Sequence, residues 1–284
     1  MTSTMKLAVP NKGRLEEPTA RLLREAGLSY ERSERTLAAP VRNVDIEILF
    51  VRADDVCELV ADGVAALGVT GLDLVAESDA SLEVLAELDY GHCRLVAAVP
   101  TASEVDDLSA FEGLRVATAH SGVTKRFFDD KGIAVTLVPL RGSVEVAPKL
   151  GVADAIVDLV SSGSTMLING LRQVETLLES QAALVAAPGS AAHGEAERMA
   201  TMLRAVTAAR RKRYVLMNAP TAAVPEVIRL IPGLESPTVV PLAHDGMVSV
   251  QSVVDADDLW GLLPELERAG ASGILVLPIQ QMIA

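Results

Sequence analysis

The segment from Asp154 to Thr165, with the sequence DAIVDLVSSGST, carries residue types that suit the binding of a phosphorylated sugar. Its apolar part predicts a strand that ends at Val160, and a short loop with hydroxyl groups and a glycine follows. Such a loop lets backbone N–H groups converge on an anion beside the positive end of the next helix. Asp158 lies near the end of the strand, where its carboxylate suits the hydroxyl groups of a ribose 5-phosphate. The residues predicted to cradle the phosphate are Ser161, Ser162, Gly163, Ser164 and Thr165.

A purely structural explanation of this loop remains open. Ser164 or Thr165 can cap the helix that follows, and the loop is then only a turn rich in serine and glycine. A motif this short does not separate the two interpretations. The elements that position the loop therefore have to be considered with it.

Strand and helix patterns alternate along the first three quarters of the chain, which predicts an α/β architecture with parallel sheets. Strands are predicted at 6–10, 44–50, 65–70, 94–99, 114–119, 134–140 and 154–159. Helices are predicted at 15–26, 53–61, 123–131, 143–150 and 195–211, whereas 171–187 fits either a helix or two strands. Ligands of such sheets bind beyond the carboxyl ends of the strands, which is where the loop 161–165 stands.

The order of elements changes from residue 212 onward. Strands are predicted at 213–218, 238–242, 247–254 and 273–279, and helices at 221–230 and 256–269. The order β-α-β-β-α-β is that of the ferredoxin-like unit, so we expect a separate C-terminal domain. Pro264 lies inside the last predicted helix, where a kink is expected.

Composition limits the classes of partner. The chain has 284 residues and a net charge of −13, so no overall cationic field would attract a nucleic acid. No apolar run reaches membrane-spanning length without charges, and the N-terminus lacks a secretory signal, so we expect a cytoplasmic protein with no membrane partner. The two cysteines, Cys57 and Cys93, form no disulfide framework or metal cluster and are expected to be buried.

Ten residues from Glu145 to Met166 stand at the spacing E-x5-G-x-A-x2-I-x-D-L-x2-S-G-x-T-M. This spacing resembles the phosphoribosyl-pyrophosphate motif of the ATP phosphoribosyltransferase family. The segments Val9–Leu15, Gly68–Asp73 and Gly233–Thr238 resemble that family's opening loop, its second substrate loop and part of its regulatory domain. By resemblance, the sequence is identified as a member of the long, histidine-regulated form of the family.

The resemblance implies a fold and a domain organisation. The expected catalytic core has two lobes and is similar to type II periplasmic binding proteins. One lobe would comprise residues 1–90 with 184–211, and the other, carrying the phosphoribosyl-pyrophosphate loop, residues 91–183. Residues 212–284 would form the ferredoxin-like domain, which binds histidine in the long form.

The resemblance also implies an activity. The expected reaction transfers the 5-phosphoribosyl group of phosphoribosyl pyrophosphate to N1 of ATP and releases pyrophosphate, as the first step of histidine biosynthesis. L-histidine is the expected feedback inhibitor, and homo-oligomers, as dimers and hexamers, are the expected assembly. Mg²⁺ is the expected cofactor, bound mainly through substrate phosphates, and its protein ligands are not assigned.

The site residues that the family implies fall into three groups. Glu145 and Asp158, with the loop 161–165, are expected to bind phosphoribosyl pyrophosphate. The ATP-binding residues are expected to be Lys12, Gly13, Arg14, Arg52, Gly71, Asp73 and His120. The residues expected to bind histidine are Asn218, Leu234, Ser236, Thr238 and Gly273. Without the family, Lys12 and Arg14 would be read as solvated charges, and Asp73 as the cap of a helix.

Two positions depart from the family pattern, and one rival function shares the predicted fold. His120 stands where the family usually has an aromatic residue, although an imidazole can still stack on a base. Asn218 stands where an Asp is frequent, and an amide would bind the amino group of histidine less strongly than a carboxylate. The rival is a two-lobed solute-binding protein, which would bind a ligand without transforming it.

Overall fold

The structure is a computed structural model that describes residues 4–33, 36–189 and 194–283. These residues form two compact units. The first unit runs to Arg24 and continues from Leu28 to Ala200, and the second comprises Glu25–Gly27 and the chain from Thr201 onward. No helix of the described ranges combines the length and the apolar character that a membrane crossing requires.

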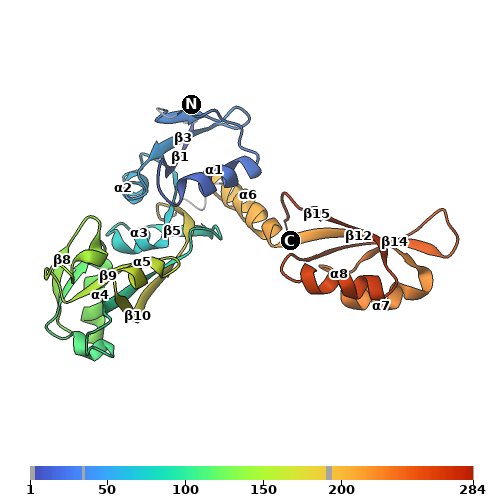
Figure 1. The fold of residues 1–284 in the computed structure, drawn as a ribbon. Coiled ribbons are helices and arrows are strands. Elements are labelled where there is room, and N and C mark those ends of the chain that lie inside the picture. The colour runs from blue at the N-terminus through green and yellow to red at the C-terminus, as the bar shows by residue number, and fades with distance from the viewer. Residues whose placement is uncertain (1–3, 34–35, 190–193, 284) are drawn as a thin grey trace. The chain divides into compact units, whose positions relative to one another are not determined.

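The first unit contains two sheets, and the first of them has six strands in the order β2-β3-β1-β4-β11-β5. Its strands are β1 (Met5–Pro10), β2 (Ala38–Pro40), β3 (Ile46–Val51), β4 (Leu67–Gly71), β5 (Glu83–Glu87) and β11 (Ala182–Ala186). The helices that follow its strands are α1 (Glu16–Glu25), α2 (Val56–Ala61) and α3 (Leu72–Glu77). We call this sheet and its helices the first lobe (Figure 1). β1 runs parallel to β3 and β4, whereas β2 and β11 run antiparallel to their neighbours.

The second sheet has five strands in the order β10-β6-β9-β7-β8 and forms the second lobe. Its strands are β6 (Cys93–Pro100), β7 (Arg115–Thr118), β8 (Thr136–Pro139), β9 (Ala155–Val160) and β10 (Leu171–Ser180). Its helical segments are η1 (Leu108–Phe111), α4 (Ser121–Lys131), η2 (Val144–Val146) and α5 (Ser164–Ile168). Alternate residues of β6 and β9 enter two separate apolar clusters, so both faces of this sheet are covered.

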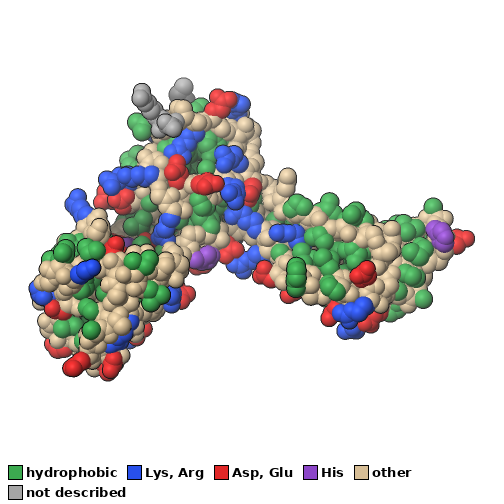
Figure 2. All heavy atoms as spheres, in the orientation of Figure 1, with side chains coloured by type: hydrophobic (Ala, Val, Ile, Leu, Met, Phe, Trp, Pro, Cys, Tyr) green, Lys and Arg blue, Asp and Glu red, His purple; other side chains and the backbone are tan. Residues whose placement is uncertain are grey.

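The second unit contains most of α6 (Gly194–Arg210) and a four-stranded sheet in the order β13-β14-β12-β15. Its other elements are β12 (Lys212–Pro220), η4 (Thr221–Ala223), α7 (Val224–Leu230), β13 (Thr238–Pro241), β14 (Met247–Asp255), α8 (Leu259–Arg268) and β15 (Ser272–Pro278). The helices α7 and α8 cover one face of the sheet (Figure 1). The core between helices and sheet includes the buried residues Val215, Val250 and Leu266. Hydrophobic side chains also gather on the surface of this unit (Figure 2), among them Leu275 and Leu277.

The α/β fold class and the C-terminal ferredoxin-like unit are confirmed, and the open segment 171–187 forms two strands, β10 and β11. The prediction of parallel sheets was wrong, because both sheets are mixed. The chain enters the second lobe along β6 and returns along β10 and β11, which reverses the direction of neighbouring strands. Two strands of the first lobe, β2 and β5, had not been predicted.

The predicted helix at 143–150 was also wrong. Only Val144–Val146 is helical, as a single 3₁₀ turn, and turns follow it. Ser143 has a positive φ of 52°, which is outside the α-helical region. Pro148 lacks a backbone N–H and disfavours helical geometry at the residue before it, so the turn does not extend.

Candidate functional site

The loop after β9 has the form that the sequence predicted. Gly163 has φ 76° and ψ −7°, a left-handed conformation that glycine adopts without a side-chain clash, and α5 begins at Ser164. The hydroxyls of Ser162 and Ser164 lie 2.9 Å apart, and both residues are exposed. Within the described ranges, the backbone N–H groups of Ser162 and Gly163 donate to no protein acceptor. The loop 161–165, which we call the cradle, thus presents free donors to solvent.

Asp158 lies on the face of β9 that leads to the cradle. Ile156 and Val160, two residues to either side, are both buried in the cluster that contains Met166 of α5, and alternate residues of a strand share a face. Burial raises the pKa of Asp158 above its ordinary value, and the nearby carboxylate of Glu145 raises it further, although the N–H of Leu159 opposes both by donating to Oδ1 at 2.8 Å. Asp158 and Glu145 therefore form a pair of neighbouring carboxylates beside the cradle.

A second carboxylate, Asp73 at the start of α3, is held by a network of donors. Arg14 Nη2 donates to Asp73 Oδ1 at 2.8 Å, and Ser180 Oγ donates to the same oxygen at 2.6 Å. His120 Nε2 lies 3.6 Å from Asp73 Oδ2. Burial alone would raise the pKa of Asp73, but the nearby His120 ring, the hydrogen bond from Ser180 and the charge of Arg14 outweigh it and lower the pKa to about 2. Asp73 is therefore an anion at neutral pH.

Gly71 and Arg14 show why the sequence folds around Asp73 in this way. A Cβ at Gly71 would stand 2.2 Å from Asp73 Oδ1, so only glycine leaves room for the carboxylate there. Arg14 also donates through Nη1 to Gly91 O at 2.7 Å and to Cys93 Sγ at 2.6 Å. Its guanidinium is consequently bound by protein groups on several sides.

His120 precedes α4 and is 7% exposed. Its backbone N–H donates to Thr118 Oγ1 at 2.9 Å, and its carbonyl accepts from Thr124 Oγ1 at 2.6 Å. Among the described residues, its Nδ1 has no hydrogen-bond partner. The next turn is capped from the first lobe, because Glu77 of α3 accepts the N–H groups of Gly122 and Val123, both at 2.8 Å.

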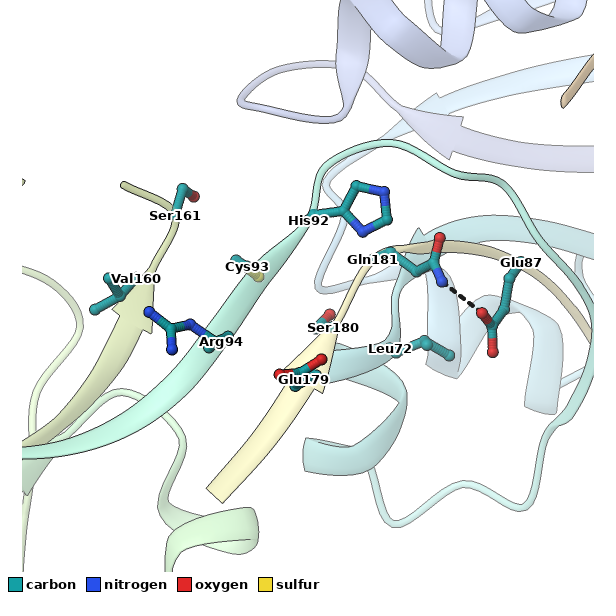
Figure 3. A pocket seen from close by; sticks show the side chains of 10 residues that line it. All are labelled: Leu72, Glu87, His92, Cys93, Arg94, Val160, Ser161, Glu179, Ser180 and Gln181. Atoms are coloured by element: carbon teal, nitrogen blue, oxygen red, sulfur yellow. Dashed lines mark hydrogen bonds between the residues drawn. The ribbon is translucent and has the colours of Figure 1, made fainter. Parts of the chain in front are cut away.

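A pocket of about 450 Å³ joins the cradle to the Asp73 network. Its lining includes Ser161 of the cradle and Ser180 and Cys93, which contact Asp73 and Arg14 respectively. Arg94 and Glu179 also line it, and Figure 3 shows the Arg94 side chain pointing from β6 toward Val160. The two predicted substrate regions therefore border one cavity.

The remaining residues expected to bind ATP lie at the surface of the first lobe. Lys12 and Gly13 are exposed in the loop between β1 and α1, and Gly13 has a positive φ of 82°. Arg52 follows β3, and its Nε lies 3.7 Å from Asp54 Oδ1, with both side chains about 60% exposed. The side chains of these two cations are accessible to a ligand, whereas the guanidinium of Arg14, although partly exposed, already donates to Asp73, Gly91 and Cys93.

The residues expected to bind histidine separate into two groups in the second unit. Asn218 of β12 and Gly273 of β15 are neighbours, since a Cβ at Gly273 would stand 3.6 Å from Asn218 Nδ2. Leu234 and Ser236 are exposed and lead into Thr238, the first residue of β13. β13 and β15 are the opposite edges of the sheet. The chain does not bring the two groups together.

Sequence reasoning missed four residues that the structure brings to this region. Ser180 and Cys93 hold Asp73 and Arg14, Glu77 caps α4, and Arg94 lines the pocket. Ser180 is 107 residues away from Asp73, so no local motif links them. A signal for Arg94 did exist, because a charged residue inside an otherwise apolar strand is a candidate for a functional position.

Comparison with protein families gives two matches that together span most of the chain. The sequence model described as ATP phosphoribosyltransferase matches residues 52–207. The one described as HisG, C-terminal domain, matches residues 209–281. The first region holds Asp73, the cradle and the pocket, and the second holds the ferredoxin-like sheet.

Curated relatives and a solved structure agree with these matches. An ATP phosphoribosyltransferase of Methanococcoides burtonii is 42% identical over 282 residues, covering 98% of this chain and 99% of the relative. One of Phocaeicola vulgatus is 43% identical over 284 residues with the same coverage. The structure of the ATP phosphoribosyl transferase (HisG:HisZ) complex from Thermotoga maritima matches with a TM-score of 0.62 and 31% identity, covering 72% of this chain and 98% of that one.

Proposed function

The chain belongs to the ATP phosphoribosyltransferase family, and from this premise we propose how its residues bind the two substrates. The enzyme transfers the 5-phosphoribosyl group of phosphoribosyl pyrophosphate to N1 of ATP and releases pyrophosphate, the first step of histidine biosynthesis. The observation that carries this activity is identity above 40% to ATP phosphoribosyltransferases along almost the whole chain, including the C-terminal domain. A solute-binding protein with the same two lobes is therefore rejected.

The cradle binds the 5-phosphate of phosphoribosyl pyrophosphate. Free N–H groups at Ser162 and Gly163 and the exposed hydroxyls of Ser162 and Ser164 support this assignment, since phosphate oxygens accept from both kinds of donor. Asp158 and Glu145, on the face of the sheet that leads to the cradle, accept hydrogen bonds from the ribose hydroxyls. A carboxylate that burial disfavours as an anion gains from such donors.

ATP binds on the side of the first lobe. Asp73 is held as an anion by Arg14 and Ser180 and faces His120, so it organises this side of the site from below the surface, and Gly71 leaves room for its carboxylate. The exposed cations Lys12 and Arg52 meet the triphosphate. This division of roles gives the first lobe the nucleotide and the second lobe the sugar phosphate.

The chemistry then rests on positioning and on charge. N1 of adenine attacks C1 of the ribose with its lone pair, so no proton has to leave N1 before the bond forms. The carboxylates of Asp158 and Glu145 stabilise the positive charge that develops on the sugar as the C1–O bond breaks. Holding the two reactants in one cavity supplies the remainder of the rate enhancement.

Mg²⁺ fits the donors present, because it takes oxygen ligands and is usually bound through one or two carboxylates together with substrate phosphates. Asp158 and Glu145 are the neighbouring carboxylates that would hold it. When bound, the ion neutralises charge on the pyrophosphate leaving group.

The proposed domains are residues 1–90 with 184–211, 91–183, and 212–284, of which the last binds L-histidine as feedback inhibitor. Gly273 lies on the edge strand β15 and Asn218 on its neighbour β12, whereas Leu234 and Ser236 precede Thr238, the first residue of the opposite edge strand β13. Two strand spacings separate β13 from β12 and three separate it from β15, which is about 10 to 14 Å across the sheet. A histidine that touches both groups therefore requires a second copy of the chain, in keeping with a dimer or hexamer assembled in the cytoplasm.

The test of the catalytic assignment is Gly163→Val, assayed by turnover of ATP with phosphoribosyl pyrophosphate. A β-branched side chain at φ 76° displaces the cradle, and loss of oriented donors is expected to lower kcat/KM about 10²- to 10³-fold. Gly132→Val is the matched control, because Gly132 has φ 70° at the far end of α4. If both variants turn over equally, the cradle is not the sugar-phosphate site.

The test of regulation is the same turnover assay with increasing L-histidine. Inhibition in the wild type is expected, and Ser236→Ala should weaken it while the turnover without histidine stays unchanged. Saturating histidine that leaves wild-type turnover unaltered would reject the regulatory assignment.

A further inference from the structure

Arg94 is an unpaired cation in the pocket beside the cradle. It lies on β6 between Val160 of β9 and Glu179 of β10, which are its partners in the strand register. Within the described part of the chain its guanidinium makes neither an ion pair nor a hydrogen bond, not even with Glu179. The residue is exposed and lines the cavity together with Ser161 (Figure 3).

The register of the sheet places Arg94 on the same face as the cradle. Val96 and Ala98, two and four residues further along β6, are buried in the cluster that contains Val160 and Met166. Because alternate residues of a strand share a face, Arg94 belongs to that face as well. Val160, its partner across the sheet, is the last residue before the cradle. Arg94 therefore stands one strand away from the start of the phosphate loop.

Other cations near the cavity are less suited to this position. Arg14 uses its N–H groups on Asp73, Gly91 and Cys93, so it would have to break these bonds to meet a phosphate. Lys12 and Arg52 belong to the first lobe, and neither of them lines the cavity. In a chain of net charge −13, an unpaired guanidinium facing a cavity supplies the local positive charge that a phosphorylated substrate needs.

We propose that Arg94 binds the 5-phosphate held by the cradle and so determines the affinity for phosphoribosyl pyrophosphate. The proposal rests on the function assigned to the cradle and adds a charged partner to its neutral donors. A planar guanidinium can donate two N–H groups to one phosphate, which makes the contact both stronger and more directional than that of an ammonium. The cradle thus receives its cation from a neighbouring strand, outside the linear motif.

The test compares Arg94→Gln and Arg94→Lys with wild type. We expect Arg94→Gln to raise the KM for phosphoribosyl pyrophosphate and the Kd of ribose 5-phosphate about 10- to 100-fold, the range of a charge-assisted hydrogen bond. The KM for ATP and the Kd of pyrophosphate should stay within about threefold, and Arg94→Lys should recover part of the loss. Lys131→Gln, which removes a positive charge at the far end of α4, is the control and should leave all four constants unchanged.

Two results would overturn the proposal. One is wild-type affinity of Arg94→Gln for ribose 5-phosphate, and the other is a loss that falls on pyrophosphate and spares ribose 5-phosphate. Gly163→Val in the same binding assay separates the possible failures. If Gly163→Val loses ribose 5-phosphate and Arg94→Gln does not, only the role of Arg94 is wrong. If Gly163→Val also binds ribose 5-phosphate normally, both the role of Arg94 and the assignment of the cradle to the 5-phosphate are wrong.

Discussion

Asp73, which is buried, and Asp158, which is half-buried, belong to one protein unit, and the two carboxylates have different neighbours. Asp73 receives donors from Arg14 and Ser180 and faces His120, and its pKa falls from 3.8 to about 2. Asp158 has the N–H of Leu159 as a donor and a second carboxylate, Glu145, as a neighbour, and its pKa is raised.

Asp73 has its hydrogen-bond and charge partners within the protein before substrate binds, whereas Asp158 lacks an ion-pair partner among the described residues until substrate binds. The protein itself neutralises Asp73, so that region contributes to the stability of the fold. The anion of Asp158 is disfavoured by burial and by Glu145, and it becomes favourable only with external donors. Such an opposed pair of pKa shifts is typical of sites where one carboxylate is structural and the other acts on the substrate.

The largest effect that tests this comparison is on turnover. Asp158→Asn should lower kcat/KM for phosphoribosyl pyrophosphate about 10²- to 10³-fold, since the charge that stabilises the developing positive sugar is lost. Its free energy of unfolding should equal or exceed that of wild type, because a neutral amide removes the unfavourable buried anion. Steady-state kinetics and urea unfolding of the same preparation measure both. A variant that unfolds more easily than wild type would place Asp158 with Asp73 as a structural residue.

The second effect is on stability. Asp73→Asn leaves Arg14 without its buried anionic partner and replaces one of the two acceptor oxygens with an NH₂ donor, so the free energy of unfolding should fall by about 3 kcal/mol. Urea unfolding at pH 7 gives the difference, and Asp106→Asn is the control because its pair with Arg172 is solvent-exposed on the Asp106 side. Equal stability of Asp73→Asn and wild type would mean that the network contributes nothing to the fold.

The sequence predicted the cradle in full and the Asp73 network only in outline, for a physical reason. Ser161–Thr165 is one continuous segment, so its glycine, its hydroxyls and the helix after it could be recognised from their spacing. Asp73 and Arg14 were recognised by family resemblance, but Ser180 and Cys93 approach them only because β10 and β6 cross between the lobes. The same crossing makes the sheets mixed. The alternation of helices and strands in the sequence does not reveal whether neighbouring strands run parallel or antiparallel, so the mixed sheets could not be predicted from it.

The third effect depends on pH and has opposite signs at the two carboxylates. Above pH 3.8 Asp73 is ionised in both the folded and the unfolded chain, and its full contribution of about 2 kcal/mol is present. As the pH falls from 3.8 to about 2, the unfolded chain is protonated first and this contribution is lost. Asp158 behaves in the reverse way, because its raised pKa means that protonation on acidification removes an unfavourable charge from the folded state.

The measurement compares each Asn variant with wild type between pH 6 and pH 3. At pH 6 wild type should be more stable than Asp73→Asn, and this difference should shrink on acidification. Asp158→Asn should be more stable than wild type at pH 6, and that difference should shrink on acidification too. Parallel curves for both pairs would show that neither carboxylate has a shifted pKa in the folded state.

The smallest effect concerns the contact that joins the two regions. Glu77 of α3, four residues after Asp73, accepts the N–H groups of Gly122 and Val123 in the first turn of α4, where His120 provides no side-chain cap. Glu77→Gln keeps one acceptor oxygen but loses the charge near a helix N-terminus, so the free energy of unfolding should fall by about 1 kcal/mol. Because His120 directly precedes α4, a modest rise in the KM for ATP should accompany it, with the KM for phosphoribosyl pyrophosphate unchanged. Glu112→Gln is the matched control, since Glu112 accepts the N–H of Ala134 within the second lobe and bonds neither α3 nor the first turn of α4. If the two variants behave alike in both measurements, the contact between α3 and α4 has no special role in aligning His120 with Asp73.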